Sequence, residues 1–141
     1  TPTVQRQLDT LAVVARPRVG DGNKQDPRNG IWHGTGACGE TIVGLAVSII
    51  VTPDEKLSAM QVYFPSAQGG DSNPVQTGIL SMAGTIDPAT NAFKLLPGNW
   101  IFRPRGHNAL GFSGTLDVNA GVISAKYDRK ECGEINLRKM N

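Results

Sequence analysis

Histidine and cysteine have the widest chemical range of the residues in this chain, and their spacing does not predict a catalytic or metal site. The two histidines, His33 and His107, lack neighbouring Cys, Asp or Glu at metal-ligand spacing. Cys38 follows His33 at an odd separation, which on a regular strand places the two side chains on opposite faces. A thiol nucleophile activated by histidine is therefore not predicted. We expect no metal, no cofactor and no catalytic residue.

Carboxylates and closely spaced glycines are better explained as turns and strands than as sites. Asp54 and Glu55 fall in the turn-like stretch TPDEK, and Glu131 and Glu134 flank Cys132. Solvated turn charges account for both pairs. The stretch GTGACG lies on an expected strand with no helix after it, so it offers no helix N-terminus to hold a phosphate.

Aromatic and cationic side chains alternate in the stretch WIFRPRGHN, residues 100–108. This order would present cations beside an aromatic surface, and arginine and aromatic residues are enriched at the energetic centres of protein interfaces. The alternative is a core tryptophan followed by a solvated basic turn. The candidate binding residues of the stretch are Trp100, Phe102, Arg103, Arg105 and His107.

The overall composition is that of one globular domain. The chain has 141 residues, of which 39% are hydrophobic and 18% charged, and its formal net charge is +2. This near-neutral balance gives no reason to expect nucleic acid or an anionic membrane as the partner. No apolar run approaches the roughly 18 residues of a spanning helix, so no membrane span is expected. The 17 glycines indicate turns and strands.

The N-terminal part, residues 1–29, is expected to lie outside the main domain, which we expect over residues 30–141. Apolar residues recur near the N-terminus at intervals of three and four, which predicts a short amphipathic helix over residues 1–16. These positions are Val4, Leu8, Leu11 and Val14. Pro, Gly, Asp and Asn dominate the residues that follow, which indicates an irregular linker.

From Ile31 onward the dominant hydrophobic period is two, the period of a β-strand. Residues 41–51 place large apolar side chains at odd positions and mostly small ones at even positions. The next segment places Met60, Val62 and Phe64 on one face. About eight short strands result, joined by short turns with no crossover helix, which predicts an all-β antiparallel meander.

An open meander of eight strands leaves two edges exposed, and closure into an up-and-down barrel makes its first and last strands neighbours. Cys38 ends the first expected strand and Cys132 begins the last. Antiparallel pairing of these strands would bring the two cysteines within bridging reach, so we expect a Cys38–Cys132 disulfide. Two free buried thiols are the alternative.

The first expected strand opens with Gly30-Ile31-Trp32. A Gly-x-Trp on the first strand of a small eight-stranded meander resembles the calycin group, which includes lipocalins, avidin-type biotin binders and small barrel inhibitors of bacterial metalloproteases. The segments WHGTGAC, LSMAGTID, LLPGNWIF, LGFSGTLDV and CGEINLRK are similar to uncharacterised bacterial exported β-domains. The resemblance implies a small barrel in a secreted or periplasmic location. The sequence starts at Thr1 without an initiator Met, which is expected either of a trimmed sequence or of a mature chain from which a leader has been removed.

Two classes of binding function fit such a barrel, and an enzyme is the third class. A protein-binding module, such as an inhibitor or an immunity-type protein, would use loops 65–76 and 103–108. A small-ligand barrel would take an apolar or anionic ligand at an interior or mouth lined by Trp32, Tyr63 and Trp100. Large apolar residues fill the regular faces, and eight strands enclose a space that side chains just fill. A packed interior and protein binding are therefore favoured.

Overall fold

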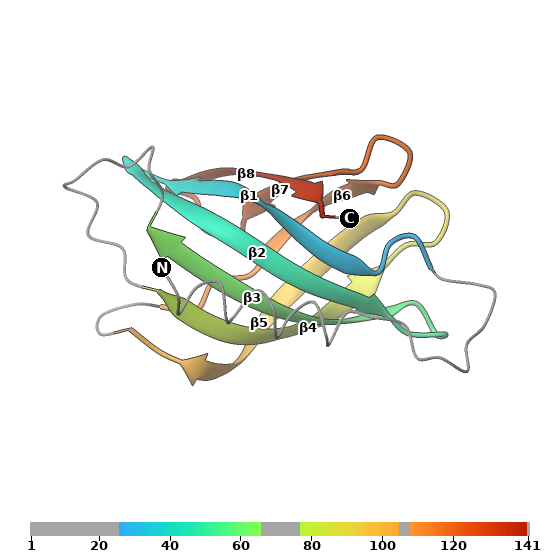
Figure 1. Cartoon of the computed structure of the whole chain (residues 1–141), viewed down its shortest axis with the longest axis horizontal. Helices are drawn as coiled ribbons and strands as arrows, with labels where there is room; N and C mark the ends of the chain where they lie inside the picture. The colour runs from blue at the N-terminus through green and yellow to red at the C-terminus, as the bar shows by residue number, and fades with distance from the viewer. Residues whose placement is uncertain (1–25, 66–76, 105–107, 141) are drawn as a thin grey trace.

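The computed structural model describes residues 26–65, 77–104 and 108–140. In this part of the chain, eight antiparallel strands form a closed barrel in which sequence neighbours pair and the last strand pairs with the first (Figure 1). The strands are β1 (Gly30–Cys38), β2 (Thr41–Val51), β3 (Lys56–Pro65), β4 (Gly78–Ile86), β5 (Ala92–Phe102), β6 (Phe112–Asp117), β7 (Val122–Tyr127) and β8 (Cys132–Lys139). The all-β meander barrel is confirmed, whereas the helix expected over residues 1–16 lies outside the described residues.

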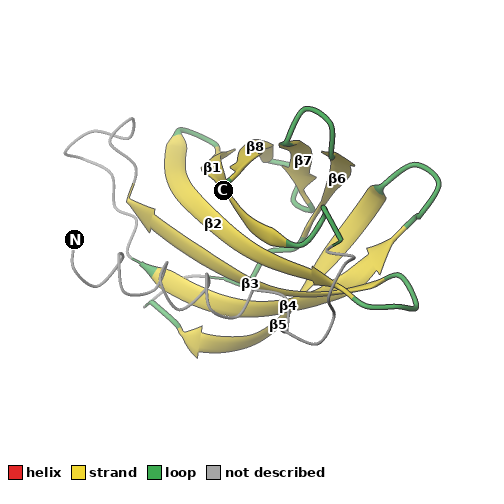
Figure 2. Cartoon of the chain, turned by 45° about the vertical axis from the view of Figure 1, so that its right-hand side comes forward, coloured by secondary structure: helices red, strands yellow, loops and turns green. Residues whose placement is uncertain are grey.

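One cluster of apolar side chains fills the barrel interior. The odd positions of β2 point into it, and Leu45, Val47 and Ile49 are buried, as their alternation predicts. The strands close around this cluster, and Figure 2 shows β6, β7 and β8 on the side of the barrel opposite β3 and β4. Its buried members are Trp32, Leu45, Val47, Ile49, Val51, Leu57, Tyr63, Leu80, Met82, Ile86, Phe93, Leu95, Phe112, Leu116, Ile123, Ala125, Tyr127, Cys132, Ile135 and Leu137.

A second, smaller apolar cluster lies on the outside of the barrel. The face of β3 that carries Met60, Val62 and Phe64 belongs to this outer cluster. Leu57 and Tyr63, on the other face of β3, belong to the interior cluster. The more hydrophobic face of β3 therefore points away from the barrel axis.

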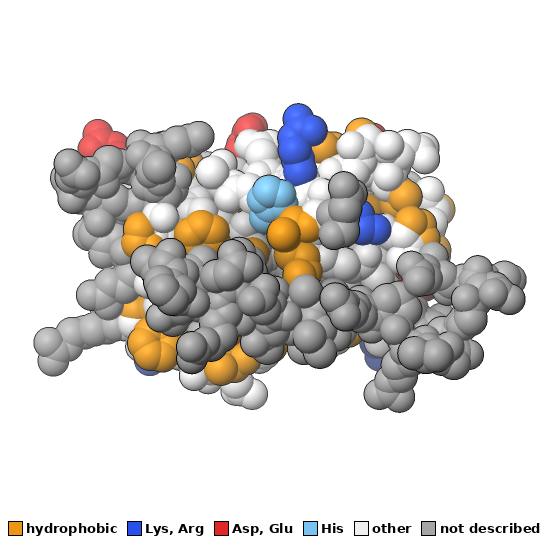
Figure 3. Space-filling view, in the orientation of Figure 1, with side chains coloured by type: hydrophobic (Ala, Val, Ile, Leu, Met, Phe, Trp, Pro, Cys, Tyr) orange, Lys and Arg blue, Asp and Glu red, His pale blue; other side chains and the backbone are white. Residues whose placement is uncertain are grey.

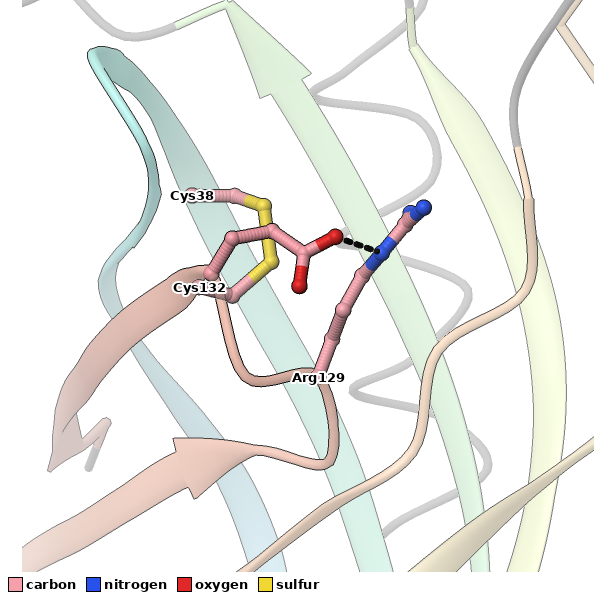
Figure 4. The surroundings of a disulfide bond; sticks show 4 residues. Cys38, Arg129 and Cys132 are labelled. Carbon is pink, nitrogen blue, oxygen red and sulfur yellow. Dashed lines mark hydrogen bonds and ion pairs between the residues drawn. A yellow bond between two sulfur atoms is a disulfide. The ribbon is translucent and has the colours of Figure 1, made fainter.

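The barrel seam between β1 and β8 is covalently fastened. Cys38 and Cys132 are register partners at the end of β1 and the start of β8, and their sulfur atoms form a disulfide (Figure 4). The expected bridge is confirmed, and the alternative of two free thiols is wrong. In the turn before Cys132, the Arg129 Nε lies 3.0 Å from the Glu131 Oε1, an ion pair that Figure 4 also shows.

Glycine allows neighbouring strands to approach closely at several points of the sheet, and Gly84 and Gly34 are two of them. A Cβ on Gly84 would lie 1.7 Å from the backbone oxygen of Lys94, and one on Gly34 would lie 2.0 Å from that of Asn136. Both distances are far below any van der Waals contact, so a side chain there would push the paired strand away. Gly133 in β8 is different, because its nearest neighbours would be 3.7 Å or more away.

Candidate functional site

The predicted binding residues divide between the two ends of the barrel. Because the strands alternate in direction, β1, β3 and β5 all begin at one end and finish at the other. We call the end with the β1–β2, β3–β4, β5–β6 and β7–β8 connections the disulfide end, and the other the Arg28 end. Trp32, near the start of β1, lies at the Arg28 end, whereas Tyr63 and Trp100, near the ends of β3 and β5, lie at the disulfide end.

At the Arg28 end, the Trp32 side chain is fully buried in the barrel interior. Its indole Nε1 donates a hydrogen bond of 3.2 Å to the Arg28 carbonyl oxygen. The Lys139 ammonium lies 5.7 Å from the centre of the ring, within the range of a cation–π contact. Trp32 is therefore satisfied by its own chain.

Arg28 ties this end together with two ion pairs. Its guanidinium lies 2.7 Å from an Asp26 carboxylate oxygen and 2.6 Å from a Glu55 carboxylate oxygen in the β2–β3 turn. Hydrogen bonds from Arg28 lower the pKa of Asp26 below its ordinary value, and the two carboxylates raise the pKa of Arg28. The arrangement joins the segment before β1 to the β2–β3 turn.

At the disulfide end, aromatic rings contact one another across β4, from β3 to β5, and between the neighbouring strands β6 and β7. Tyr63 and Trp100 meet edge to face with ring centres 6.2 Å apart, and Phe112 and Tyr127 do so at 6.5 Å. Burial raises the pKa of the Tyr63 phenol to about 12, although the positive charge of Arg103 opposes the shift. Burial also raises the pKa of Tyr127. Both phenols are therefore held neutral and cannot serve as bases near neutral pH.

Large apolar side chains are exposed along the last part of β5. Ile101 is 57% exposed, Phe102 58% and Leu96 50%. The Arg103 guanidinium lies 6.0 Å from the centre of the Trp100 ring, just inside these side chains. Figure 3 shows hydrophobic surface at this end of β5, at the lower left of the view. We call Trp100, Ile101, Phe102 and Arg103 the β5 tip.

The β5 tip lies at the end of an irregular strand. Within the described chain, β4 pairs with β5 from Phe93 to Phe102, whereas β6 pairs with β5 only over residues 92–95. Pro97 has no backbone N–H, and the register shifts between Leu80 and Met82. The Ser81 hydroxyl accepts a hydrogen bond from the Asn99 N–H at 2.8 Å and donates one to the Asn99 carbonyl at 3.1 Å. These features make the part of β5 beyond its pairing with β6 unfavourable for the addition of another strand.

One polar side chain in the barrel interior has no partner. Gln61 is 4% exposed on the face of β3 that points inward, and its Oε1 accepts no hydrogen bond within the described structure. Its register neighbours Val47 and Leu80 are both fully buried and apolar. An unsatisfied buried amide oxygen costs about 1–3 kcal/mol.

The structure brings together some of the predicted binding residues and separates others. Tyr63, Trp100 and Arg103 lie in one cluster with Phe102 beside it, but Trp32 is at the opposite end. Arg105 and His107 lie outside the described residues. The sequence analysis did not select Ile101 or Leu96 because neither stands out in a strand without knowledge of exposure, and it did not select Gln61.

The rest of the described chain adds no metal site and no membrane-spanning helix. Across residues 26–65, 77–104 and 108–140, His, Cys, Asp and Glu side chains nowhere gather in a group that could bind a metal ion. In the same residues, no helix has the length and apolar character needed to cross a membrane. Comparisons with protein-family models, with curated proteins and with solved structures found no match for this chain.

Proposed function

We propose that this protein is a protein-binding module that recognises its partner through the β5 tip. The observation that carries the proposal is the exposure of Ile101 and Phe102, each more than half exposed at the end of β5. Exposed large apolar side chains, with an arginine over a tryptophan ring beside them, have the composition of an interface hot spot. The backbone that carries these side chains is already paired with β4, so binding would not have to order it.

The mode of recognition follows from the irregular backbone of β5. Pro97 and the Ser81–Asn99 hydrogen bonds leave little regular strand for a partner to extend. We therefore propose that side chains, rather than strand addition, make the interface. The matching partner surface has an apolar pocket for Phe102 and Ile101.

The calycin resemblance and an exported location belong to the same proposal. A closed eight-stranded meander with Gly30-Ile31-Trp32 at the start of its first strand supports the resemblance. The Cys38–Cys132 disulfide supports a secreted or periplasmic location, because structural disulfides persist in oxidising compartments. Within the calycin range, the packed interior favours an inhibitor or immunity-type role.

The test compares three forms of the protein as baits in secreted and periplasmic fractions of the native host. The first is the wild type, the second is Ile101→Ser/Phe102→Ser, and the third is the control Ser124→Ala/Lys126→Ser on the exposed outer face of β7. We expect one protein to be retained by the wild type and the control and lost with the double serine variant. That protein, purified, should then bind the wild type at least tenfold more tightly than the variant. Equal retention by all three forms would overturn the proposal.

A small-ligand barrel is the second candidate, and Gln61 is the observation that favours it. Its unpartnered Oε1 inside the apolar interior would accept a hydrogen bond from a ligand donor. Native mass spectrometry of the purified protein tests this candidate, because a bound small molecule would add mass that Gln61→Leu abolishes. If both forms show the mass of the chain alone and Gln61→Leu is the more stable, the interior holds no ligand.

A further inference from the structure

The charged residues of the barrel wall are distributed unevenly between its strands. Strands β1–β5 contain no Asp or Glu, and their Lys and Arg residues are Lys56 and Lys94 alone. Strands β6–β8 carry charges of both signs, and their carboxylates are Asp117 and Glu134. The Lys56 ammonium lies 3.8 Å from an Asp54 carboxylate oxygen in the preceding turn. Among the described residues, Lys94 forms no ion pair.

Strand β5 presents its exposed apolar side chains between two cations. Lys94 and Leu96 point outward, because the positions that alternate with them, Phe93 and Leu95, are buried in the interior cluster. At the other end of the strand, Arg103 follows directly after Phe102. We call the exposed set the β5 stripe, which consists of Lys94, Leu96, Ile101, Phe102 and Arg103.

The neighbouring strands leave the β5 stripe accessible. On β4, the register neighbours of Leu96 and Lys94 are Ala83 and Thr85, which are exposed and smaller than the side chains beside them. On the other side, β6 pairs with β5 only over residues 92–95. A partner can therefore contact the stripe along its length.

Two carboxylates lie near β5, and both accept hydrogen bonds from groups close to them. Asp87, in the turn between β4 and β5, accepts a hydrogen bond of 2.8 Å from the Ala89 N–H. Asp128, which lies beside Gly111, accepts one of 3.0 Å from the Ser113 hydroxyl. Neither carboxylate forms an ion pair with Lys94. The positive charge of Lys94 is therefore available to a partner.

A surface with apolar groups between two cations is complementary to one with apolar groups between two anions. We propose that the partner presents such an acidic surface, with carboxylates opposite the two cations of the β5 stripe and apolar side chains on Leu96 and Phe102. This inference rests on the proposed function, because it names the chemistry of the partner that binds the β5 tip. It also extends the interface along β5 from the tip to Leu96 and Lys94.

The length of the β5 stripe agrees with the size of a specific interface. The stripe runs from residue 94 to residue 103, and at about 3.3 Å per residue it is at most about 30 Å long. A specific complex buries about 800 Å² on each partner, which corresponds to a patch roughly 30 Å across. One partner can therefore reach both cations.

An anionic membrane is the alternative occupant, and the number of cations disfavours it. Segments that bind anionic lipids carry clusters of about four to eight Lys or Arg residues. The β5 stripe contributes only Lys94 and Arg103. Two cations at the ends of an apolar row are sufficient to orient a protein partner, because charges at the rim of an interface act on the association rate and on specificity.

The test uses a phage-displayed library of random peptides of about ten residues, which span about 30 Å when extended. Peptides are selected on the immobilised wild-type protein, and those that do not bind Ile101→Ser/Phe102→Ser are ligands of the β5 tip. We expect Asp and Glu to be several-fold more frequent in these ligands than in the unselected library.

A pair of charge variants then measures the contribution of Lys94 with one of the selected peptides. Lys94→Glu should weaken its binding by about threefold or more, because an attractive charge pair becomes repulsive. Lys126→Glu makes the same charge change on the exposed outer face of β7 and should leave the affinity unchanged. Both substitutions are at exposed positions, so neither disturbs the core.

The outcomes separate this inference from the proposed function. Peptides that depend on Ile101 and Phe102 but have no excess of Asp and Glu overturn the inference, as do equal effects of the two charge variants. A library that yields no such peptide also overturns it, whereas the bait experiment decides the proposed function separately. Vesicles of phosphatidylserine and phosphatidylcholine test the alternative. Binding to them that is lost with Ile101→Ser/Phe102→Ser overturns the inference in favour of a membrane surface.

Discussion

Removal of the disulfide tests how the barrel is held closed. Cys38→Ala/Cys132→Ala deletes the cross-link while the rest of the β1–β8 seam, from Trp32 to Gly36, keeps its register with β8. The bridge joins residues separated by 94 positions. In the chain-entropy model a loop of this length restricts the unfolded state by about 4.7 kcal/mol at room temperature. We expect the free energy of unfolding to fall by about 4–5 kcal/mol.

The assay is equilibrium unfolding in urea followed by the fluorescence of the two tryptophans. Because the m-value for a domain of this size is about 2 kcal/mol/M, the urea midpoint should fall by roughly 2–3 M. The m-value itself should rise, since the unfolded chain without its cross-link exposes more surface. Far-ultraviolet circular dichroism before unfolding should be unchanged.

Reduced wild-type protein is the matched control, because it lacks the cross-link but keeps both sulfur atoms. Its stability should equal that of the double alanine variant to within about 1 kcal/mol. A loss of less than about 1 kcal/mol in either form would refute the loop-closure reasoning. A large loss in the alanine variant alone would attribute the effect to packing around Cys132, which is buried in the core.

Three other measurements follow from local geometry. In urea unfolding, Gly84→Ala should lower the free energy of unfolding by about 2 kcal/mol or more, because the added Cβ would clash with the backbone of the paired strand. Gly133→Ala is the control and should change the free energy of unfolding by less than about 1 kcal/mol, so equal effects of the two variants would contradict the geometry. In a spectrophotometric titration of the folded protein neither tyrosine should ionise near pH 10, because burial raises the pKa of both Tyr63 and Tyr127, and a transition near pH 10 would contradict this. The free energy of unfolding should fall as the pH rises above about 10, because the tyrosines of the unfolded chain lose their protons there while those of the folded chain keep them. Asp26→Asn should cost about 1 kcal/mol at pH 7. Its difference from wild type should begin to shrink as the pH falls below about 4 and should vanish only once the pH is below the lowered pKa of Asp26, because the carboxyl then loses its contribution by becoming protonated; a difference that stays constant as the pH falls from 5 into the acid range would contradict the ion-pair account.

The barrel could be predicted from the sequence because apolar residues recur with the two-residue period of a β-strand. The disulfide could be predicted because closure of the sheet pairs the first strand with the last. The odd positions of β2 are large and apolar, and the structure turns them inward. The same reasoning does not place β3, whose outward face carries Met60, Val62 and Phe64 while its inward face includes Gln61. Alternation of apolar and polar residues identifies the two faces of a strand. When both faces carry apolar side chains, as in β3, the sequence does not predict which face points into the barrel.

The residues of the β5 tip could be predicted only in part, for similar reasons. Trp100, Phe102 and Arg103 were selected by composition, which is a local property. Exposure of Ile101 depends on the shape of β5 beyond Leu95, and that shape depends on a hydroxyl from β4 that hydrogen bonds to the β5 backbone. The Arg28–Glu55 ion pair likewise joins residues that are 27 positions apart. No period or short motif encodes such contacts.

The pairing between β5 and β6 extends only over residues 92–95 in the described chain, whereas the seam between β1 and β8 is bridged by a covalent bond. A barrel that is cross-linked between β1 and β8 and has a short pairing between β5 and β6 should open first between β5 and β6. Thermal fluctuations should separate β5 from β6 before any other strand pair, with the β5 tip on the moving side of the gap. A partner that binds the β5 tip would therefore contact a strand next to the weakest strand pair of the barrel.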